Sequence, residues 1–238
     1  MRTIVYTDLD GTLLDPETYS CSMAEPGIRM LREMGTPLVL CSGKTRAELE
    51  YWRGQLRLDT PFIVENGGAI YIPRHYFPFR PEGSTPRDGY DVIELGAPYR
   101  ELVQALERAS LVSKCRTLGF HQMSVAEICV RTLLPVRHAE FAKKREYDEP
   151  FEILGSCAHR LLSAIRSLGK NCIQRDRFYH LFGSNDKASA IRRLTTLYTR
   201  AHCEIAEAHV ITTSRGPAAW NEAIQDLAAA EPAVTVNW

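Results

Sequence analysis

Residues 3–13 of the chain read TIVYTDLDGTL. The first five are β-branched or aromatic, which predicts a short buried strand. Two carboxylates follow directly, Asp8 and Asp10, and then come Gly11 and Thr12. At the end of a buried strand, such a pair can place one acid in line with a phosphorus atom and the other beside the leaving oxygen. An isolated Asp-x-Asp pair is more often a solvated turn, but this position favours chemistry through an aspartyl-phosphate.

Strands and helices alternate along the next fifty or so residues. Apolar spacing predicts helices at 26–34 and 45–56, with strands at 37–41 and 61–64. Such alternation is typical of a parallel sheet. The sequence therefore predicts an α/β fold that binds ligands beyond the carboxyl ends of its strands.

The alternation stops near residue 73. Four prolines between residues 73 and 86 exclude a regular helix there, and the section that follows mixes helices with short strands. We therefore predict a discontinuous core made of residues 1–73 and 181–238. An α+β cap domain is expected at residues 74–180, inserted into that core.

The last part of the chain returns to the alternating pattern. We expect strands at Phe178–Phe182 and His209–Thr213, and helices at Lys187–Arg200 and Pro217–Leu227. Lys187 stands in the first turn of its helix, where a positive charge is unfavourable to the helix dipole. Most lysines are solvated surface residues, but this one is a candidate for neutralising a phosphate group.

Ser42 follows the second expected strand and begins the string Ser-Gly-Lys-Thr. A nucleotide-binding P-loop would need a further glycine five residues before Gly43, and Leu38 stands there. We therefore interpret Ser42 as a hydroxyl donor to a phosphate oxygen at the start of the next helix. A simple helix N-cap is the alternative interpretation.

The composition excludes several classes of protein. Of the 238 residues, 29 are basic and 29 acidic, so no single sign of charge attracts nucleic acid or a membrane surface. No apolar run reaches the ~20 residues of a membrane helix, and the N-terminus does not resemble a secretory signal. We expect a cytoplasmic protein. Its seven scattered cysteines, without a Cys-x-x-Cys pair, are expected to be reduced thiols.

Longer stretches resemble one family, the mannosyl-3-phosphoglycerate phosphatases of the haloacid dehalogenase superfamily. Asp8, Ser42 and Lys187 come in the order of the first three motifs of that superfamily. The closer resemblance rests on TDLDGTLLD at 7–15, LCSGKTRAE at 40–48, FIVENGGAIYIP at 62–73, REYDEPF at 145–151, RFYHL at 177–181 and GPAAWNEA at 216–223. These stretches are spread over nearly the whole chain.

The resemblance implies a Rossmann-like core with a C2-type α/β cap. It also implies Mg²⁺-dependent removal of phosphate from a glycosyl-3-phosphoglycerate, a small phosphorylated sugar-glycerate, to give mannosylglycerate, a compatible solute. Asp8 would be the nucleophile and a magnesium ligand. Asp10 would protonate the leaving alcohol, then activate water, and would offer its backbone carbonyl to the metal.

The other expected site residues surround these two acids. The residues expected to bind phosphate are Gly11, Thr12, Ser42 and Lys187. The residues expected to bind the rest of the substrate are Lys44, Arg46, Asn66 and Arg145. The three cations among them are candidates for holding the glycerate carboxylate, which arginine can bind in bidentate fashion.

One acidic loop of the family is missing. The family pattern has a strand and a Gly-Asp-Ser-x-x-Asp loop before Trp220, but no aspartate occurs between Lys187 and Gln225. The gap corresponds to about one β-α unit, roughly thirty residues, and it removes metal ligands. Glu204 and Glu207, one helical turn apart, are candidate replacements, although a solvated helix face is the commoner interpretation of such a pair.

Three further positions bear on the comparison with the family. Gly43 stands where a serine is usual, and His121-Gln122 stand in a cap loop where Gly-Asp is common. Both departures are expected to change substrate preference. Asp186 superficially resembles the lost acidic loop, but it lies where the family has its lysine loop, so we assign it no metal role.

Two other functions stay open beside the phosphatase. One is a catalytically impaired or inactive descendant that keeps a phosphosugar-binding cleft. The other, which has less support, is a sugar phosphomutase with a similar first motif and cap type. The intact Asp8, Asp10, Ser42 and Lys187 favour the phosphatase, whereas the missing acidic loop favours the inactive descendant.

Overall fold

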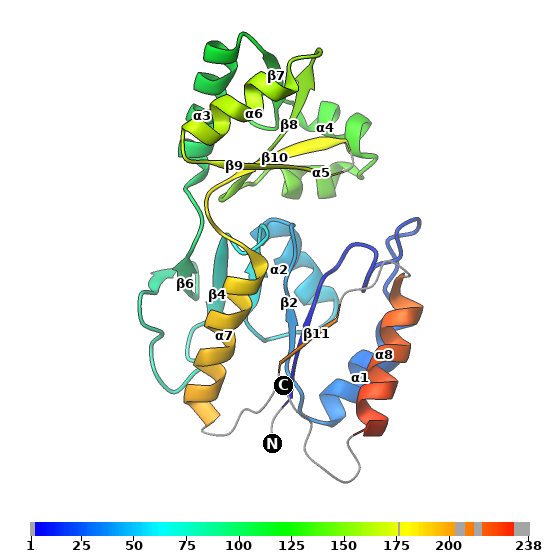
Figure 1. Cartoon of the computed structure of the whole chain (residues 1–238). Helices are drawn as coiled ribbons and strands as arrows, with labels where there is room; N and C mark the ends of the chain where they lie inside the picture. The colour runs from blue at the N-terminus through cyan, green and yellow to red at the C-terminus, as the bar shows by residue number, and fades with distance from the viewer. Residues whose placement is uncertain (1–2, 176, 203–207, 212–215, 231–238) are drawn as a thin grey trace.

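The computed structural model describes residues 3–175, 177–202, 208–211 and 216–230. The described chain forms two lobes, one above the other, joined where it leaves the lower lobe and where it returns (Figure 1). The lower lobe contains both ends of the described chain and is the core. The upper lobe is the cap.

The core contains three parallel strands. β1 (Ile4–Thr7) lies between β2 (Leu38–Leu40) and β11 (Ala208–Ile211). All four residues of β1 are buried, as expected for a parallel strand covered on both faces. The predicted α/β fold with a parallel sheet is confirmed. β11 covers part of the strand expected at His209–Thr213, and the last two residues of that range lie outside the described part.

Helices cover both faces of this sheet (Figure 1). α1 (Glu25–Glu33) and α8 (Gly216–Ala230) pack on one face, and α7 (Lys187–His202) packs on the other. Val5 belongs to the apolar cluster on the α1 side and Tyr6 to the cluster on the α7 side. This division follows from the strand geometry, because successive side chains point to opposite faces.

A four-stranded antiparallel sheet extends the core beyond β2, and a parallel bridge between Cys41 and Ile63 connects the two. In the order of pairing its strands are β3 (Phe62–Val64), β4 (Ala69–Pro73), β6 (Tyr90–Glu94) and β5 (Thr85–Arg87). The expected cap start at residue 74 therefore falls inside this sheet. Pro86 does not break the sheet because β5 is an edge strand, where proline is tolerated. We propose that the cap begins after Leu95.

The cap is built on a second antiparallel sheet of order β7-β8-β10-β9. Its strands are β7 (Arg116–Gly119), β8 (Asp148–Leu154), β9 (Asn171–Arg175) and β10 (Phe178–Phe182). Its helices are α3 (Tyr99–Ser113), α4 (Val125–Thr132), α5 (Val136–Ala142) and α6 (Ala158–Ser167). The strand expected at Phe178–Phe182 forms, but the expected return to the core at residue 181 falls inside it, and β10 belongs to the cap sheet because it pairs with β8 and β9. We propose that the chain re-enters the core at about Gly183.

Two of the described helices begin with a capping box. Ser124 and Glu127 form a capping box at the start of α4, with the Ser124 amide donating to Glu127 Oε2 at 2.8 Å. An equivalent box starts α2 (Arg46–Gln55), where Thr45 caps and Glu48 completes the pair. A short 3-10 helix, η1 (Ser22–Ala24), precedes α1.

The cap contains a disulfide between Cys115 and Cys157, so the expectation that all cysteines are reduced is wrong. The bond joins the end of α3 to the start of α6, and the two Cα atoms are 5.7 Å apart. The two cysteines are 42 residues apart in sequence, and only the fold shows that their geometry suits a bond. The described free cysteines are Cys21, Cys41, Cys129 and Cys172.

None of the helices in the described part of the chain has both the length and the apolar character needed to cross a bilayer. The cytoplasmic location remains a prediction.

We predict that loss of the disulfide destabilises the cap. A bond closing a loop of this length constrains the unfolded chain, an effect worth about 2–4 kcal/mol. In urea unfolding, the Cys115→Ala/Cys157→Ala protein should show this loss, and a reducing agent should cause the same loss in the unaltered protein. Cys129→Ala changes a free cysteine of the same lobe and is the matched control. An unfolding midpoint that does not respond to the reducing agent would contradict the prediction.

Candidate active site

Six of the predicted residues lie on the wall of one cavity between the core and the cap, and Lys44, Asn66 and Arg145 are three of them. Asp8, Asp10 and Ser42 line this cavity, which has a volume of about 360 Å³. The two acids follow β1 and the serine follows β2, so the cavity lies beyond the carboxyl ends of the parallel strands. From the cap, the wall receives Phe120, Arg145, Pro150, Arg175, Phe178 and His180, among other residues.

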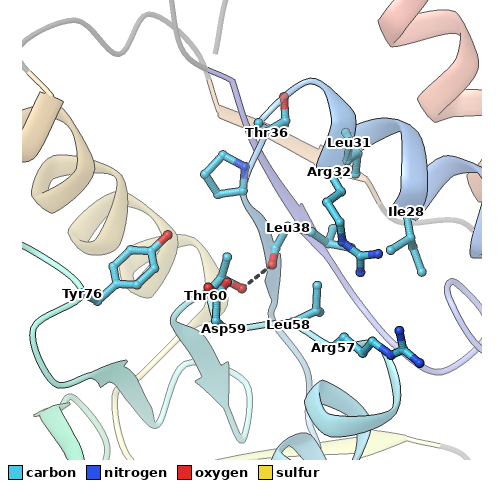
Figure 2. Close-up of a pocket in the computed structure, with 12 residues that line it drawn as sticks. Ile28, Leu31, Arg32, Thr36, Leu38, Arg57, Leu58, Asp59, Thr60 and Tyr76 are labelled. Carbon is cyan, nitrogen blue, oxygen red and sulfur yellow. Dashed lines mark hydrogen bonds between the residues drawn. The ribbon is translucent and has the colours of Figure 1, made fainter.

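A separate cavity of about 270 Å³ lies at the opposite end of β2 (Figure 2). It is bounded by α1, by the first residue of β2 and by the segment Leu58–Thr60. The Thr60 hydroxyl donates to the Leu38 carbonyl at 2.6 Å in its wall. Because open parallel sheets bind ligands beyond the carboxyl ends of their strands, the core–cap cavity is the candidate active site.

Asp8 and Lys187 form a direct ion pair. Lys187 Nζ lies 2.5 Å from Asp8 Oδ2, and the Leu9 amide donates to Asp8 Oδ1 at 2.8 Å. Both side chains are partly exposed. Lys187 is the first residue of α7 and, with Asp8, lines a neighbouring hollow rather than the core–cap cavity itself. The structure thus brings Lys187 to Asp8, as predicted, and Asp8 connects the two spaces.

The loop after β3 positions Lys187. Glu65, Asn66 and Gly67 all have positive φ angles, of 46°, 56° and 92°. A Cβ atom on Gly67 would lie 2.3 Å from the Asp186 carbonyl oxygen, so this close approach requires glycine. Tight packing of the loop against the residue before Lys187 therefore fixes where α7 starts.

Ser42 is buried at the end of β2 and does not cap a helix. Thr45 is the N-cap of α2, and its side chain accepts from the Glu48 amide at 3.2 Å. The Ser42 amide donates to the Ile63 carbonyl, and its carbonyl accepts from the Asn66 amide. The N-cap alternative is therefore wrong, and the Ser42 hydroxyl stays available as a phosphate contact.

Lys44 holds Asp10 in place. Its Nζ lies 3.0 Å from Asp10 Oδ1 and 3.4 Å from Glu48 Oε1. Burial of Lys44 opposes its charge, but Glu48 and Asp10 together raise the pKa of this lysine above its usual value. Lys44 is thus a fixed cation whose charge is balanced by two carboxylates of the core.

The two arginines expected to contact substrate lie differently. Arg46 is absent from the cavity wall and forms ion pairs with Asp88 at 2.8 Å and Glu146 at 3.3 Å. Arg145 is on the wall, but it is buried and donates to the Gly43 carbonyl at 3.0 Å and to Asp148 at 3.3 Å. Asn66 also lines the cavity, as expected of a substrate contact.

Gly11 and Thr12 shape the loop after β1 rather than the cavity wall. Gly11 has a φ of +66°, and its carbonyl accepts from the Gly216 amide at 3.0 Å. Thr12 is buried, and its amide donates to the Leu9 carbonyl at 3.1 Å. The assignment of these two residues to phosphate binding stays a prediction, whereas their role in turning the chain follows from the contacts.

A buried carboxyl group joins the core to the cap. Glu65 accepts from the amides of Glu146 at 2.9 Å and Tyr147 at 2.6 Å, where the cap chain approaches β8. Complete burial raises the pKa of Glu65 to about 8, although Arg145 acts in the opposite direction. Over much of the physiological range this group is therefore largely a neutral acid.

His180 was missed by sequence reasoning. Its Nδ1 lies 2.7 Å from Asp148 Oδ2, and the same carboxylate oxygen accepts from Arg145. With Nδ1 engaged, Nε2 is left for the cavity that His180 lines. Phe178 and His180 both line the cavity, two residues apart on β10, so strand periodicity is the signal that could have identified this face.

The residues present fit a magnesium ion only in part. Asp8 and Asp10 supply the hard oxygen atoms that magnesium prefers. The part of the chain that the structure describes contains no group of three His, Cys, Asp or Glu side chains placed to hold a metal. The candidate replacements Glu204 and Glu207 lie outside the described residues, as do residues 212–215.

Asp186 caps the first turn of α7. Its carboxylate accepts from the amide and the hydroxyl of Ser189, at 2.8 and 2.6 Å, in the first turn of α7. These hydrogen bonds lower the pKa of Asp186, as expected for a carboxylate that caps a helix start.

The chain is similar to a family of hydrolases and to proteins named phosphatases. A family model described as haloacid dehalogenase-like hydrolase matches residues 5–78. The chain is 37% identical over 207 residues to a glucosyl-3-phosphoglycerate/mannosyl-3-phosphoglycerate phosphatase of Methanococcoides burtonii, which covers 86% of this chain and 76% of that relative. It is 39% identical over 200 residues to a mannosyl-3-phosphoglycerate phosphatase of Pyrococcus furiosus, which covers 84% of this chain and 80% of that relative.

A solved structure shows the same fold. It is a protein from Bacteroides thetaiotaomicron described among the phosphatases of the haloalkanoate enzyme superfamily. The TM-score is 0.60 at 17% identity, and the match covers 88% of this chain and 76% of the other. At this identity the likeness concerns the fold alone.

We predict that Glu65 makes stability depend on pH. Its folded-state pKa lies above its unfolded value, so between about pH 5 and 8 the folded protein keeps a proton that the unfolded chain loses. The free energy of unfolding should therefore fall as pH rises through this window. One pKa unit corresponds to about 1.4 kcal/mol. Between about pH 5 and 8, the free energy of unfolding of the Glu65→Gln protein should therefore decrease by about 2–4 kcal/mol less than that of the unaltered protein.

Urea unfolding at several pH values measures this difference. Glu17→Gln, which changes an exposed carboxylate, is the control and should follow the unaltered protein. Parallel curves for Glu65→Gln and the unaltered protein would show that Glu65 ionises normally.

Proposed function

The chain belongs to the mannosyl-3-phosphoglycerate phosphatase family of haloacid dehalogenase-like hydrolases, and on this premise we propose that it hydrolyses a glucosyl- or mannosyl-3-phosphoglycerate. The products are the glycosylglycerate, such as mannosylglycerate, and phosphate. The observation that carries this proposal is the Asp8 carboxylate on the wall of the core–cap cavity, held by Lys187 and by the Leu9 amide. The substrate class comes from the names of the relatives.

The first step transfers the phosphoryl group to Asp8. A carboxylate oxygen of Asp8 attacks phosphorus, and the bond from phosphorus to the glycerate oxygen breaks. Asp10 enters this step protonated and gives its proton to that leaving oxygen, and Lys44 at 3.0 Å then pairs with the Asp10 carboxylate. Lys187 offsets the negative charge that gathers between Asp8 and the phosphate.

The second step releases phosphate. Asp10 takes a proton from a water molecule, and the resulting hydroxide attacks phosphorus of the phosphorylated Asp8. The bond between phosphorus and the Asp8 oxygen breaks, which restores the carboxylate. Ser42, at the end of β2, is placed to donate its hydroxyl to a phosphate oxygen throughout.

Magnesium is the proposed cofactor, and Asp8 with the Asp10 backbone carbonyl would hold it. When bound, it would neutralise phosphate charge during transfer. Two protein donors would leave the other positions around the ion to water and to phosphate oxygens.

Two alternatives have less support. A phosphosugar-binding protein without turnover is suggested by the missing acidic loop, and a sugar phosphomutase by the first motif. The relatives that match over most of the chain are named phosphatases, which favours hydrolysis. The paired arrangement of Asp8 with Lys187 and of Asp10 with Lys44 also suits catalysis.

We predict that Asp8→Asn abolishes hydrolysis. The amide cannot act as the nucleophile, so phosphate release from mannosyl-3-phosphoglycerate should fall by about three or more powers of ten. Asp15→Asn is the matched control, because Asp15 lies in the same loop and only orders Thr18 and its neighbours. Ordinary turnover by the Asp8→Asn protein would exclude the aspartyl-phosphate route.

We also predict weak use of magnesium. Without the acidic loop, stabilisation of the transition state should be smaller by several kcal/mol. Each ~1.4 kcal/mol of lost stabilisation lowers the rate about tenfold. Magnesium affinity and turnover should both be far below those of the Pyrococcus furiosus relative, measured side by side by calorimetry and phosphate release. Equal magnesium dependence of the two proteins would mean that another acid completes the site.

A further inference from the structure

The cations on the cavity wall differ in how far their charge is already balanced. Among the described residues the wall contains three, Lys44, Arg145 and Arg175. Lys44 is paired with Asp10 and Glu48. Arg145 is buried against Asp148 in the same network. Both are held by carboxylates of the protein before any substrate enters.

Arg175 differs from Lys44 and Arg145 in the partners of its side chain. It is the last residue of β9, it is exposed, and no carboxylate of a described residue lies within 4.0 Å of it. Its contact is with a neutral group, because Nη1 donates to Asn66 Oδ1 at 3.4 Å. By contrast, Arg177 near the same hairpin turn is paired with Glu152 at 2.5 Å. Among the described cations of the wall, Arg175 is therefore the one that no described carboxylate pairs with.

The position of Arg175 suits a second anionic group of the substrate. The β9–β10 hairpin lies over the carboxyl ends of β1 and β2 (Figure 1). Asn66, which Arg175 contacts, packs against Gly43, where a Cβ atom would lie 3.0 Å from the Asn66 amide nitrogen. Arg175 thus reaches across the cavity from the cap to the loop beside Ser42, where the proposed function places the phosphate.

We propose that Arg175 binds the carboxylate of the glycerate part of the substrate. This inference rests on the proposed function and names the residue that sets its specificity. A carboxylate can replace the long contact to Asn66 with a charge-assisted, bidentate pair. The exposed guanidinium needs little desolvation to form it, whereas Arg145 would have to share its charge with Asp148. Arg175 thus takes the role expected for Lys44, Arg46 and Arg145.

A binding experiment tests this without requiring turnover. In full-length Asp8→Asn protein, the Kd of 3-phosphoglycerate is compared with that of glycerol 3-phosphate, which has a hydroxymethyl group in place of the carboxylate. We expect 3-phosphoglycerate to bind roughly ten- to a hundredfold more tightly, as a hydrogen-bonded charge would give. Adding Arg175→Gln should bring the ratio close to one. Adding Arg177→Gln, the matched control, should leave the ratio unchanged.

Kinetics separates this inference from the proposed function. In the otherwise unaltered enzyme, Arg175→Gln should raise KM for mannosyl-3-phosphoglycerate by a similar factor while leaving KM for p-nitrophenyl phosphate unchanged. A preference for 3-phosphoglycerate that survives Arg175→Gln would overturn the inference, even if hydrolysis occurs. A preference that depends on Arg175 in a protein that hydrolyses no phosphoglycerate would uphold the binding role and reject the proposed function.

Discussion

The ion pair between Asp8 and Lys187 is the contact on which the site depends. Its two partners are 179 residues apart in sequence, at the end of the first strand and the start of α7. They meet because the chain leaves the core to form the cap and then returns to the core beside β1. The glycine at position 67 permits the close backbone approach that sets the start of α7. Without that return, Asp8 would face phosphate with no cation beside it.

The cap is tied to the core by polar contacts that are largely buried. Glu65 receives two amides of the cap chain, and Arg145 donates to the Gly43 carbonyl in the loop after β2. Because these groups are removed from water, each needs its partner, and the arrangement fixes the cap over the strand ends. Lys44 and Arg145 are paired with carboxylates in the same region, and among the described residues of the cavity wall this leaves Arg175 as the cation able to meet a further anion.

The sequence was sufficient for the parts of the fold that depend on local pattern. The apolar run before Asp8 and the string beginning at Ser42 located the strand ends that form the site. Strand partners were less predictable, because Phe178–Phe182 has the same residue pattern whether it pairs in the core or in the cap. The disulfide and the position of Arg46, held away from the cavity by Asp88, depend on long-range contacts that spacing does not reveal.

The proposed mechanism requires that Asp8 becomes phosphorylated during turnover. The most direct measurement is to quench the enzyme in acid while it consumes mannosyl-3-phosphoglycerate, digest it, and determine the masses of its peptides. We expect one phosphoryl group on the peptide that contains Asp8 and none on any other peptide. Hydroxylamine should remove this group, as it removes acyl phosphates. Steady phosphate release with an unmodified Asp8 peptide at every time of quenching would contradict the proposed mechanism.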